Sequence, residues 1–429
     1  MIMGISFAQN THIILKRRLG FSLFMYLIIV INTSITYAQD STSVPRPKGK
    51  WLRERGPFDP RPYECTVFKS PLINANYFNT KNKLWVENGF SFGGYASANV
   101  QWGSQGGPAH GISETLIIGA WEPLRKSNTA GRIVYGFAHD LTFGHPTTRA
   151  FADNQKLIET PNDLDTDPDL TFTTLGLLLW AQEWHTGPDR GFGYKIGQIY
   201  APSYFGSARY LDDDRRYFMA RPIAAAGGAQ WVGNNDIGLG CIIGVWKKPF
   251  FLTIGAIDGV ANRNYPDFET IVKGRMLYLG EIGIEKDPDG PNEATLRVTL
   301  SHLDIDVGDG PGQSIMISGD IHFNGLWALA GRWSKSYKRL SADHQELFSL
   351  GLMWLTPFSR KQDLAGFGAF SGKPSDNQFN WESGFEVFYK LQLTHAVSVT
   401  PDLQFWYRND DGAAAVNTWV WGIRSEFEF

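Results

Sequence analysis

The chain ends on the stretch Thr418-Trp-Val-Trp-Gly-Ile-Arg-Ser-Glu-Phe-Glu-Phe429, in which two kinds of residue alternate. The odd positions are Trp419, Trp421, Ile423, Ser425, Phe427 and Phe429. The even positions are Thr418, Gly422, Arg424, Glu426 and Glu428, with Val420 as the one apolar exception. Successive strand residues point to opposite faces, so one face of this strand suits hydrocarbon and the other suits water. A terminal strand of this kind, ending on an aromatic residue, is typical of an outer-membrane β-barrel.

The composition agrees with a barrel. The 429 residues suffice for one large barrel or two ordinary domains. Aromatic residues make up 14% and charged residues 19%, yet the mean hydropathy is −0.23. A helical membrane protein would be far more hydrophobic, whereas a barrel distributes its apolar residues in alternation. The net charge of −3 argues against nucleic acid as a partner.

The N-terminal segment predicts export. A basic cluster, Lys16 to Arg18, precedes the unbroken apolar run from Phe21 to Ile31. Small residues then stand at Thr36 and Ala38, so we expect residues 1–38 to be a signal peptide cleaved after Ala38. The alternative, a membrane anchor, is disfavoured because the run is shorter than the about 20 residues that span a bilayer.

Residues 39–88 are rich in proline and do not alternate. We interpret them as a periplasmic segment or a plug, with a short helix near Asn82–Glu87. Residues 89–429 are interpreted as the transmembrane β-barrel. Cys65 and Cys241 are expected to be unpaired, because Cys241 alternates in phase with apolar residues that face lipid.

The fold class predicted is all-β, a sixteen-stranded transmembrane antiparallel barrel. The expected strands lie near 89–101, 113–122, 131–143, 170–184, 191–200, 236–246, 250–258, 274–285, 293–304, 313–321, 324–336, 346–356, 363–371, 381–393, 397–408 and 416–429. Short and long connections alternate between them, as short periplasmic turns and long outer loops do in such barrels. The face of the side chains is ambiguous in 170–184 and 346–356, where we assign no residue.

Strand parity predicts which side chains line the water-filled lumen. The wall residues expected along the path of the solute are Arg275, Arg297, Arg332, Glu386, Lys390, Asp402, Gln404, Trp406 and Arg408. Their carboxylate, guanidinium and amide groups can hydrogen-bond sugar hydroxyls. The ring of Trp406 could stack on the apolar face of a passing pyranose. The competing interpretation is that these charges only solvate and cross-link the barrel wall.

The longest connection, 201–235, would be the third outer loop, which we expect to fold into the pore. It carries the charged residues Arg209, Asp212, Asp213, Asp214, Arg215 and Arg216, which would place both signs of charge at a constriction. An exposed, salt-bridged loop tip is the alternative.

Two motifs are interpreted as misleading. Gly89-Phe-Ser-Phe-Gly93 matches the G-x-S-x-G nucleophile pattern but stands in a predicted strand, without the strand-to-helix elbow that the motif needs. Four aspartates between 163 and 169 could bind calcium, but Pro168 interrupts them and an acidic solvated loop is favoured.

The stretch Glu382-Ser-Gly-Phe-Glu-Val-Phe-Tyr-Lys-Leu-Gln-Leu-Thr-His-Ala-Val-Ser-Val-Thr-Pro-Asp-Leu-Gln404 resembles the carbohydrate-selective porins of the bacterial outer membrane. The segment Gly193-Tyr-Lys-Ile-Gly-Gln198, with Phe205 downstream, is similar to the strand that precedes the third loop of that family. The resemblance implies a sixteen-stranded barrel that passes glucose and related sugars. It carries over no catalytic residues.

The predicted function is therefore facilitated diffusion of mono- or oligosaccharides across the outer membrane, without enzymatic activity or a cofactor. The expected partners are carbohydrate solutes, outer-membrane lipid and lipopolysaccharide; a homotrimer is compatible with the sequence, which does not decide the oligomeric state. The alternatives are a general or acid-sugar porin, a lipase-like barrel enzyme, and a secreted soluble sugar-binding β-protein. The enzyme would need a Ser–His pair at the membrane face, and the outward aromatic strands disfavour the soluble protein.

Overall fold

The computed structural model describes residues 67, 68, 73 and 75–429, except 145–146, 163–170, 213–215, 225–236, 261–265, 287–292, 305–311, 324, 338–343, 377 and 410–414. All of these lie in one of the two compact units of the chain, Pro47–Phe429. The other unit, Met1–Arg46, contains the predicted signal peptide and lies outside the described residues.

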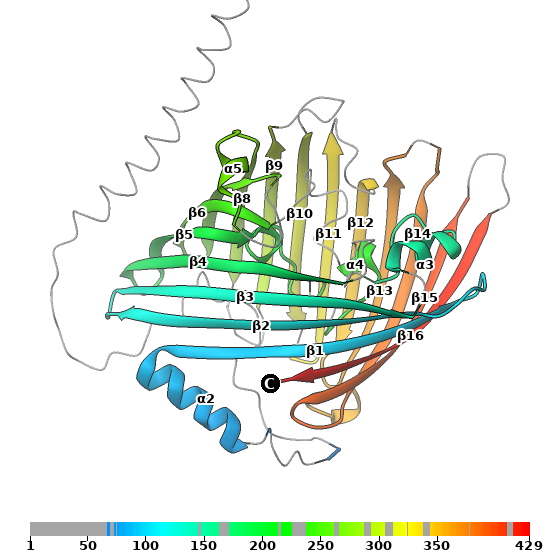
Figure 1. Ribbon diagram of the computed structural model, residues 1–429, viewed down its shortest axis with the longest axis horizontal. Coiled ribbons are helices and arrows are strands. Elements are labelled where there is room, and N and C mark those ends of the chain that lie inside the picture. The colour runs from blue at the N-terminus through cyan, green and yellow to red at the C-terminus, as the bar shows by residue number, and fades with distance from the viewer. Residues whose placement is uncertain are drawn as a thin grey trace, which may run out of the picture. The chain divides into compact units, whose positions relative to one another are not determined.

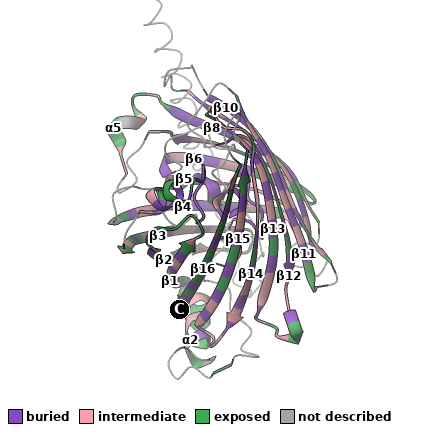
Figure 2. Cartoon of the chain, turned by 90° about the vertical axis from the view of Figure 1, so that its right-hand side faces the viewer, coloured by how far each residue is buried: buried purple, intermediate pink, exposed green. Residues whose placement is uncertain are grey.

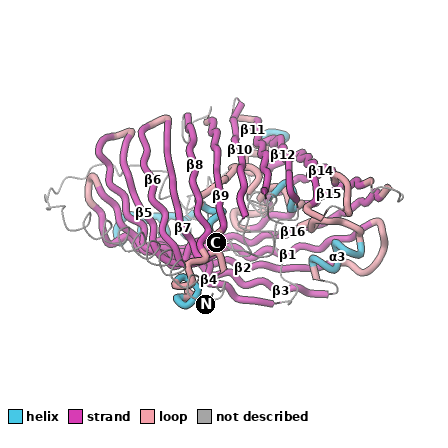
Figure 3. Tube along the Cα trace, turned by 90° about the horizontal axis from the view of Figure 1, so that it is seen from above, coloured by secondary structure: helices cyan, strands magenta, loops and turns pink. Residues whose placement is uncertain are grey.

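Sixteen antiparallel strands form a closed barrel within the described residues, each paired with its neighbours in sequence (Figures 1 and 3). They are β1 (Phe90–Gly103), β2 (His110–Arg125), β3 (Thr129–Gly144), β4 (Thr171–Gly187), β5 (Arg190–Tyr200), β6 (Ile237–Lys247), β7 (Phe250–Asp258), β8 (Met276–Lys286), β9 (Ala294–Leu303), β10 (Gly312–Phe323), β11 (Trp327–Tyr337), β12 (His344–Trp354), β13 (Leu364–Pro374), β14 (Glu382–Gln392), β15 (Val397–Arg408) and β16 (Val416–Glu428). The predicted fold class is confirmed, and every predicted strand has its counterpart.

Strand β16 closes the barrel against β1. Asn99 stands opposite Arg424 in this pair, and the amide of Phe429 donates to the carbonyl oxygen of Gly94 at 3.0 Å. The terminal phenylalanine therefore completes the seam with its backbone as well as contributing its ring. No unpaired strand edge remains along this seam, which is what a barrel gains over an open sheet.

The two faces of the strands differ as alternation predicts (Figure 2). Along β16, Trp421 and Ile423 are 44% and 50% exposed, whereas the next residue, Arg424, which points to the opposite face, is 1% exposed. The exposed face is apolar and the buried face is polar, which is the reverse of a soluble sandwich and suits a hydrocarbon exterior. On β13 to β16 the outward rings of Phe367, Phe385, Phe405 and Trp419 contact one another in a row across four strands.

Short helices accompany the barrel: α2 (Ala75–Asn88), α3 (Thr148–Asn154), α4 (Arg221–Ala224) and α5 (Phe268–Ile271), with single 3₁₀ turns at Ala201–Ser203 and Pro357–Ser359. None of the helices in the described part of the chain has the length and hydropathy needed to cross a bilayer.

The helix predicted near residues 82–87 is longer than expected, since α2 begins at Ala75. It packs against β1, and the guanidinium of Arg125 donates to the carbonyl oxygens of Trp85 and Val86 at its C-terminal end. The ammonium of Lys81 lies 5.2 Å from the ring centre of Phe92 on β1. Residues 75–88 thus lie at the end of the barrel where β1 begins.

Candidate functional site

The long connection between β5 and β6 is attached to the inner face of the barrel. Its first part, residues 201–212, contacts the wall formed by β8 to β11 and the adjoining turn residue Glu293. The contacts are the amide of Gly206 to Glu281, Arg297 to Ser207, Arg209 to Glu293, Arg332 to Asp212, and the Tyr210 hydroxyl with His322. Each joins a loop residue to an inward-facing or rim residue, so the wall polar groups hold the loop in place.

The second part of the same loop, residues 216–224, crosses to β12–β16. The backbone amides of Met219 and Ala220 donate to the two carboxylate oxygens of Glu386, at 2.7 and 2.8 Å. Arg424 donates to the carbonyl oxygen of Tyr217 at 2.9 Å, and the Arg216 guanidinium lies 2.7 Å from Glu428. One loop therefore binds both sides of the barrel interior.

Apolar side chains strengthen this attachment. The fully buried ring of Phe205 packs in a cluster whose wall members include Ile242, Ile257 and Leu277. The ring of Phe218, also fully buried, packs edge-on against Phe388 at 5.2 Å between ring centres. The inner wall is thus apolar beneath the loop, although it is polar elsewhere.

These clusters explain the two segments whose parity was ambiguous. Leu177, Leu179 and Ala181 of β4 face inward, beneath the loop cluster, while Leu178 faces outward. In β12, the inward Leu347 and Met353 join the Phe218 cluster while Phe348 and Leu352 face outward. Both faces of these strands are apolar because one meets lipid and the other meets a loop.

A second loop also folds inward, which the sequence did not predict. Residues 155–162, after α3, bind the inner face of β1 and β14–β16. The contacts are Gln101 and Gln404 to the Pro161 carbonyl oxygen, Thr418 to that of Gln155, Arg408 to that of Lys156, and the Ile158 amide to Glu382, at 2.8 to 3.0 Å. The amide of Arg221 donates to the Thr160 carbonyl oxygen at 3.2 Å, so the two inward loops also touch.

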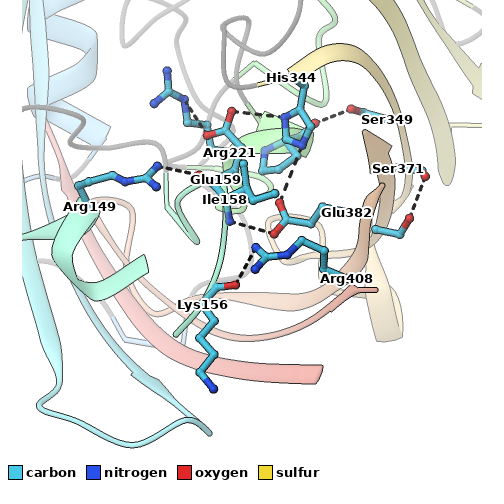
Figure 4. A network of polar contacts seen from close by, with 12 residues as sticks. Arg149, Lys156, Ile158, Glu159, Arg221, His344, Ser349, Ser371, Glu382 and Arg408 are labelled. Carbon is cyan, nitrogen blue, oxygen red and sulfur yellow. Dashed lines mark hydrogen bonds and ion pairs between the residues drawn. The ribbon is translucent and has the colours of Figure 1, made fainter. Parts of the chain in front are cut away.

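The two loops and the wall meet around His344, the first residue of β12 (Figure 4). Its Nδ1 lies 3.5 Å from Glu159 of the second loop, and its Nε2 lies 3.8 Å from Glu382 of β14. Arg221 of the third loop lies 3.6 Å from the other oxygen of Glu159. Figure 4 shows this cluster, in which residues of both loops and of the wall come together.

Most of the predicted wall residues lie on the inner face and are covered by the loops or by one another. Arg332, Glu386, Lys390, Asp402, Gln404, Trp406 and Arg408 are each at most 8% exposed. Lys390 pairs with Glu426 of β16 at 3.0 Å. The Arg297 guanidinium contacts Ser207 and lies 3.9 Å from Glu281. Arg275 stands one residue before β8 and is exposed, so it is not part of the strand wall.

The sugar-stacking hypothesis for Trp406 requires correction. The residue is 1% exposed, its ring packs edge-on against Phe370 at 4.7 Å, and its Nε1 donates to Gln404 at 3.1 Å. No face of the ring is free for a solute. Parity places the side chain inside the barrel but does not reveal what covers it there.

The predicted charged residues of the third loop are only partly described. The side chains of Arg209, Asp212 and Arg216 are 22%, 15% and 31% exposed, and each is paired with an oppositely charged wall or rim residue. Asp213, Asp214 and Arg215 lie outside the described residues. Arg221, further along the same loop, is 22% exposed and belongs to the same group.

The remaining motifs have no site around them in the described residues. Gly89 to Gly93 runs from the end of α2 into β1, so no strand-to-helix elbow forms there. The aspartates at 163–169 lie outside the described residues, as does Cys65. Cys241 is a buried free thiol. No group of three metal-ligating side chains is found in the part of the chain that the structure describes.

Comparison with known proteins agrees with this architecture. The sequence model of the carbohydrate-selective porin family, OprB, matches residues 312–429. This part of the chain, a little over a quarter of its length, is similar to the carbohydrate-selective porins. The match covers β10 to β16, including the segment on which the resemblance was recognised, so the resemblance is confirmed.

Solved structures extend the likeness to the whole barrel. The high-pH structure of Pseudomonas putida OprB superposes with a TM-score of 0.67 at 13% identity, over 86% of this chain and 100% of that one. The low-pH structure of the same protein gives 0.52 at 12% identity, over 84% and 99%. At this identity the likeness establishes the fold alone. Among curated proteins, none matches the sequence.

Proposed function

We propose that the chain is an outer-membrane porin that lets neutral mono- or oligosaccharides diffuse into the periplasm. The observation that carries the proposal is the match of β10–β16 to the carbohydrate-selective porins within a closed barrel whose inner face is polar. A channel of this kind binds its solute weakly at several points, so that the solute is released again.

The solute path that we propose follows the third loop rather than the wall. The wall groups are covered, whereas the side chains of Arg209, Arg216 and Arg221 are partly exposed. A guanidinium is planar and carries several donors, which suits the hydroxyl pairs of a sugar.

Charge pairing favours neutral over acidic sugars. Each of these three arginines lies within 4 Å of a buried carboxylate, from Glu293, Glu428 or Glu159. Their charges are therefore largely cancelled toward the solute. An acid-sugar porin would need a surplus of positive charge along the path, so this alternative has less support. A lipase-like enzyme and a soluble sugar-binding protein receive none from the fold.

The proposal includes export and orientation. A signal peptide, residues 1–38, would be cleaved after Ala38, and residues 39–88 would form a periplasmic segment ahead of the barrel, residues 89–429. Phe429 and α2 would then lie on the periplasmic side, with the short turns. The inward loop segments, 155–162 and the described parts of 201–224, would belong to connections that begin at the outer end.

We also propose a homotrimer embedded in lipid and lipopolysaccharide. The support is an unusual polar row on the outer face, where Thr115, His139 and Thr173 are neighbours across β2–β4 and His139 lies 3.0 Å from Thr173. A polar row facing lipid is costly, and contact with another subunit would lower that cost. Ala96 and Ala98 on β1 would let a neighbour approach closely.

The test is the block of ion current by added sugar. In planar bilayers that hold the purified barrel, neutral mono- and disaccharides should reduce the current in a saturable way, and a sugar acid of similar size should do so less. Arg216→Gln should weaken the block, whereas Lys335→Gln, which breaks an ion pair with Glu346 outside the two inward loops, should not. Equal block by neutral and acidic sugars would refute the preference.

A further inference from the structure

The joint between the second loop and the wall contains an imidazole between two carboxylates. His344 is fully buried, and the side chains of Glu159 and Glu382 are each 1% exposed. The ring is confined by the neighbouring strand: a Cβ added to Gly372 of β13 would lie 2.3 Å from its Cδ2. His344 therefore cannot turn away from its two partners without moving the wall.

Both ring nitrogens face carboxylate oxygens, and this fixes the protonation state in which the joint is favourable. A neutral imidazole carries one N–H and one lone pair, so one nitrogen would present its lone pair to an anion. The imidazolium presents an N–H to each side. In Figure 4 the two contacts have ion-pair distances, 3.5 and 3.8 Å, rather than hydrogen-bond geometry, and both attract only when the histidine carries its second proton.

The other charges around the joint already balance. Arg221 of the third loop lies 3.6 Å from Glu159. Arg408 of β15 stands opposite Glu382 in the strand register, and its positive charge attracts that carboxylate. Glu382 also accepts from the amide of Ile158 at 3.0 Å. From β13, Gly372 lies against the ring and Pro374 stands opposite His344 in the strand register, and neither carries a charge. Because arginine charge already stands near both carboxylates, we take the histidine proton to add attachment rather than to supply neutrality.

We propose that His344 is a proton-controlled catch that holds the second loop in the lumen. With the proton bound, the imidazolium joins Glu159 of the loop to Glu382 of the wall. The loop then narrows the pore, and the ion current rarely switches between conductance levels. When the proton is lost, that link becomes repulsive at one nitrogen and residues 155–162 detach more often. The hydrogen bonds of Gln101 and Gln404 to Pro161 remain, so the response is increased flicker and mean conductance rather than permanent opening.

The experiment is single-channel recording of the purified full barrel between about pH 5 and about pH 8, the range in which histidine changes charge. The wild-type protein should switch between conductance levels about tenfold more often at the upper pH, the ratio expected from a modest change in loop attachment. His344→Gln should flicker at both values of pH and lose the difference. His395→Gln is the matched control, since His395 lies in the turn between β14 and β15 and is not part of the joint of His344, Glu159 and Glu382, and it should behave as wild type.

A second variant guards against misfolding of His344→Gln. Glu159→Gln changes only the loop side of the joint and should likewise flicker at both values of pH, with the heat-modifiable mobility of a folded barrel. Wild-type currents that do not change with pH, or a His344→Gln barrel that keeps the full difference, would overturn the proposal. The measured quantity is ion current. The test therefore rests on the proposed function only to the extent that the barrel must conduct ions. Failure to transport sugar would leave this test intact.

Discussion

Glu386 should decide how firmly the third loop closes the lumen. Its two carboxylate oxygens accept the amides of Met219 and Ala220 at a fully buried site. Glu386→Gln leaves one amide without an acceptor, at a cost of about 1–3 kcal/mol, and Glu386→Ala leaves two, at about 2–6 kcal/mol. These free-energy costs apply while the loop is attached, because water can hydrogen-bond the same amides once the loop is released.

The loop does not depend on Glu386 alone. The ring of Phe218 is fully buried against Phe388, and removal of such a ring costs about 3–5 kcal/mol. Either single change should therefore leave the loop mostly attached, with brief openings that become about tenfold more frequent for each 1.4 kcal/mol lost. Glu386→Ala combined with Phe218→Ala should shift the loop out of the lumen, although the two energies will not add strictly because the residues are neighbours.

The assay is single-channel conductance in planar bilayers, with the barrel first checked for heat-modifiable migration. We expect a graded series in which Glu386→Gln shows more flicker, Glu386→Ala more still, and the double variant a higher mean conductance. Glu346→Gln is the matched control, because Glu346 accepts hydrogen bonds from Trp333 and Lys335 of β11 and is not among the wall residues that bind the described parts of the loops. A double variant that conducts like the wild type would refute the view that this loop limits the pore.

Three further outcomes follow from the packing. Deleting Phe429 removes a backbone pair with Gly94 at the seam and should reduce the amount of assembled barrel in the outer membrane; normal amounts of heat-modifiable barrel would contradict this. Ile423→Arg, at the middle of the lipid-facing side of β16, should destabilise insertion by about 2–4 kcal/mol, and Asn417→Arg near the rim by at most about 1 kcal/mol, in urea titrations of folding into liposomes; equal losses would argue against the assigned membrane depth. Trp406→Ala should lower the free energy of unfolding by about 3–5 kcal/mol in the same titration, and an unchanged stability with weaker sugar block would restore the stacking role.

The barrel could be predicted because alternation is a local signal. In β14 and β15, buried positions such as Glu386 and Gln404 alternate with outward Val387 and Leu403, and the sequence shows this directly. Where an inward loop covers the wall, the signal fails. Leu177 and Leu347 face inward but are apolar, because they pack under loop residues that are distant in sequence.

The site was less predictable for the same reason. Polarity identified Glu386, Gln404 and Arg408 as inward, but it could not show that their partners are backbone groups of two loops. The second loop was missed because its attachment uses carbonyl oxygens, such as that of Pro161, which leave no mark in the side-chain pattern. His344 stands at the first position of a strand with ambiguous parity, so only the fold brings it between Glu159 and Glu382.

Sugar flux into liposomes tests the central claim most directly. Liposomes carrying the purified barrel should take up a neutral monosaccharide much faster than protein-free liposomes, and faster than they take up the corresponding sugar acid. Uptake of the neutral sugar should rise further in the Glu386→Ala, Phe218→Ala variant. A barrel that conducts ions but admits neutral sugar no faster than protein-free liposomes would contradict the proposal that this chain is a carbohydrate porin.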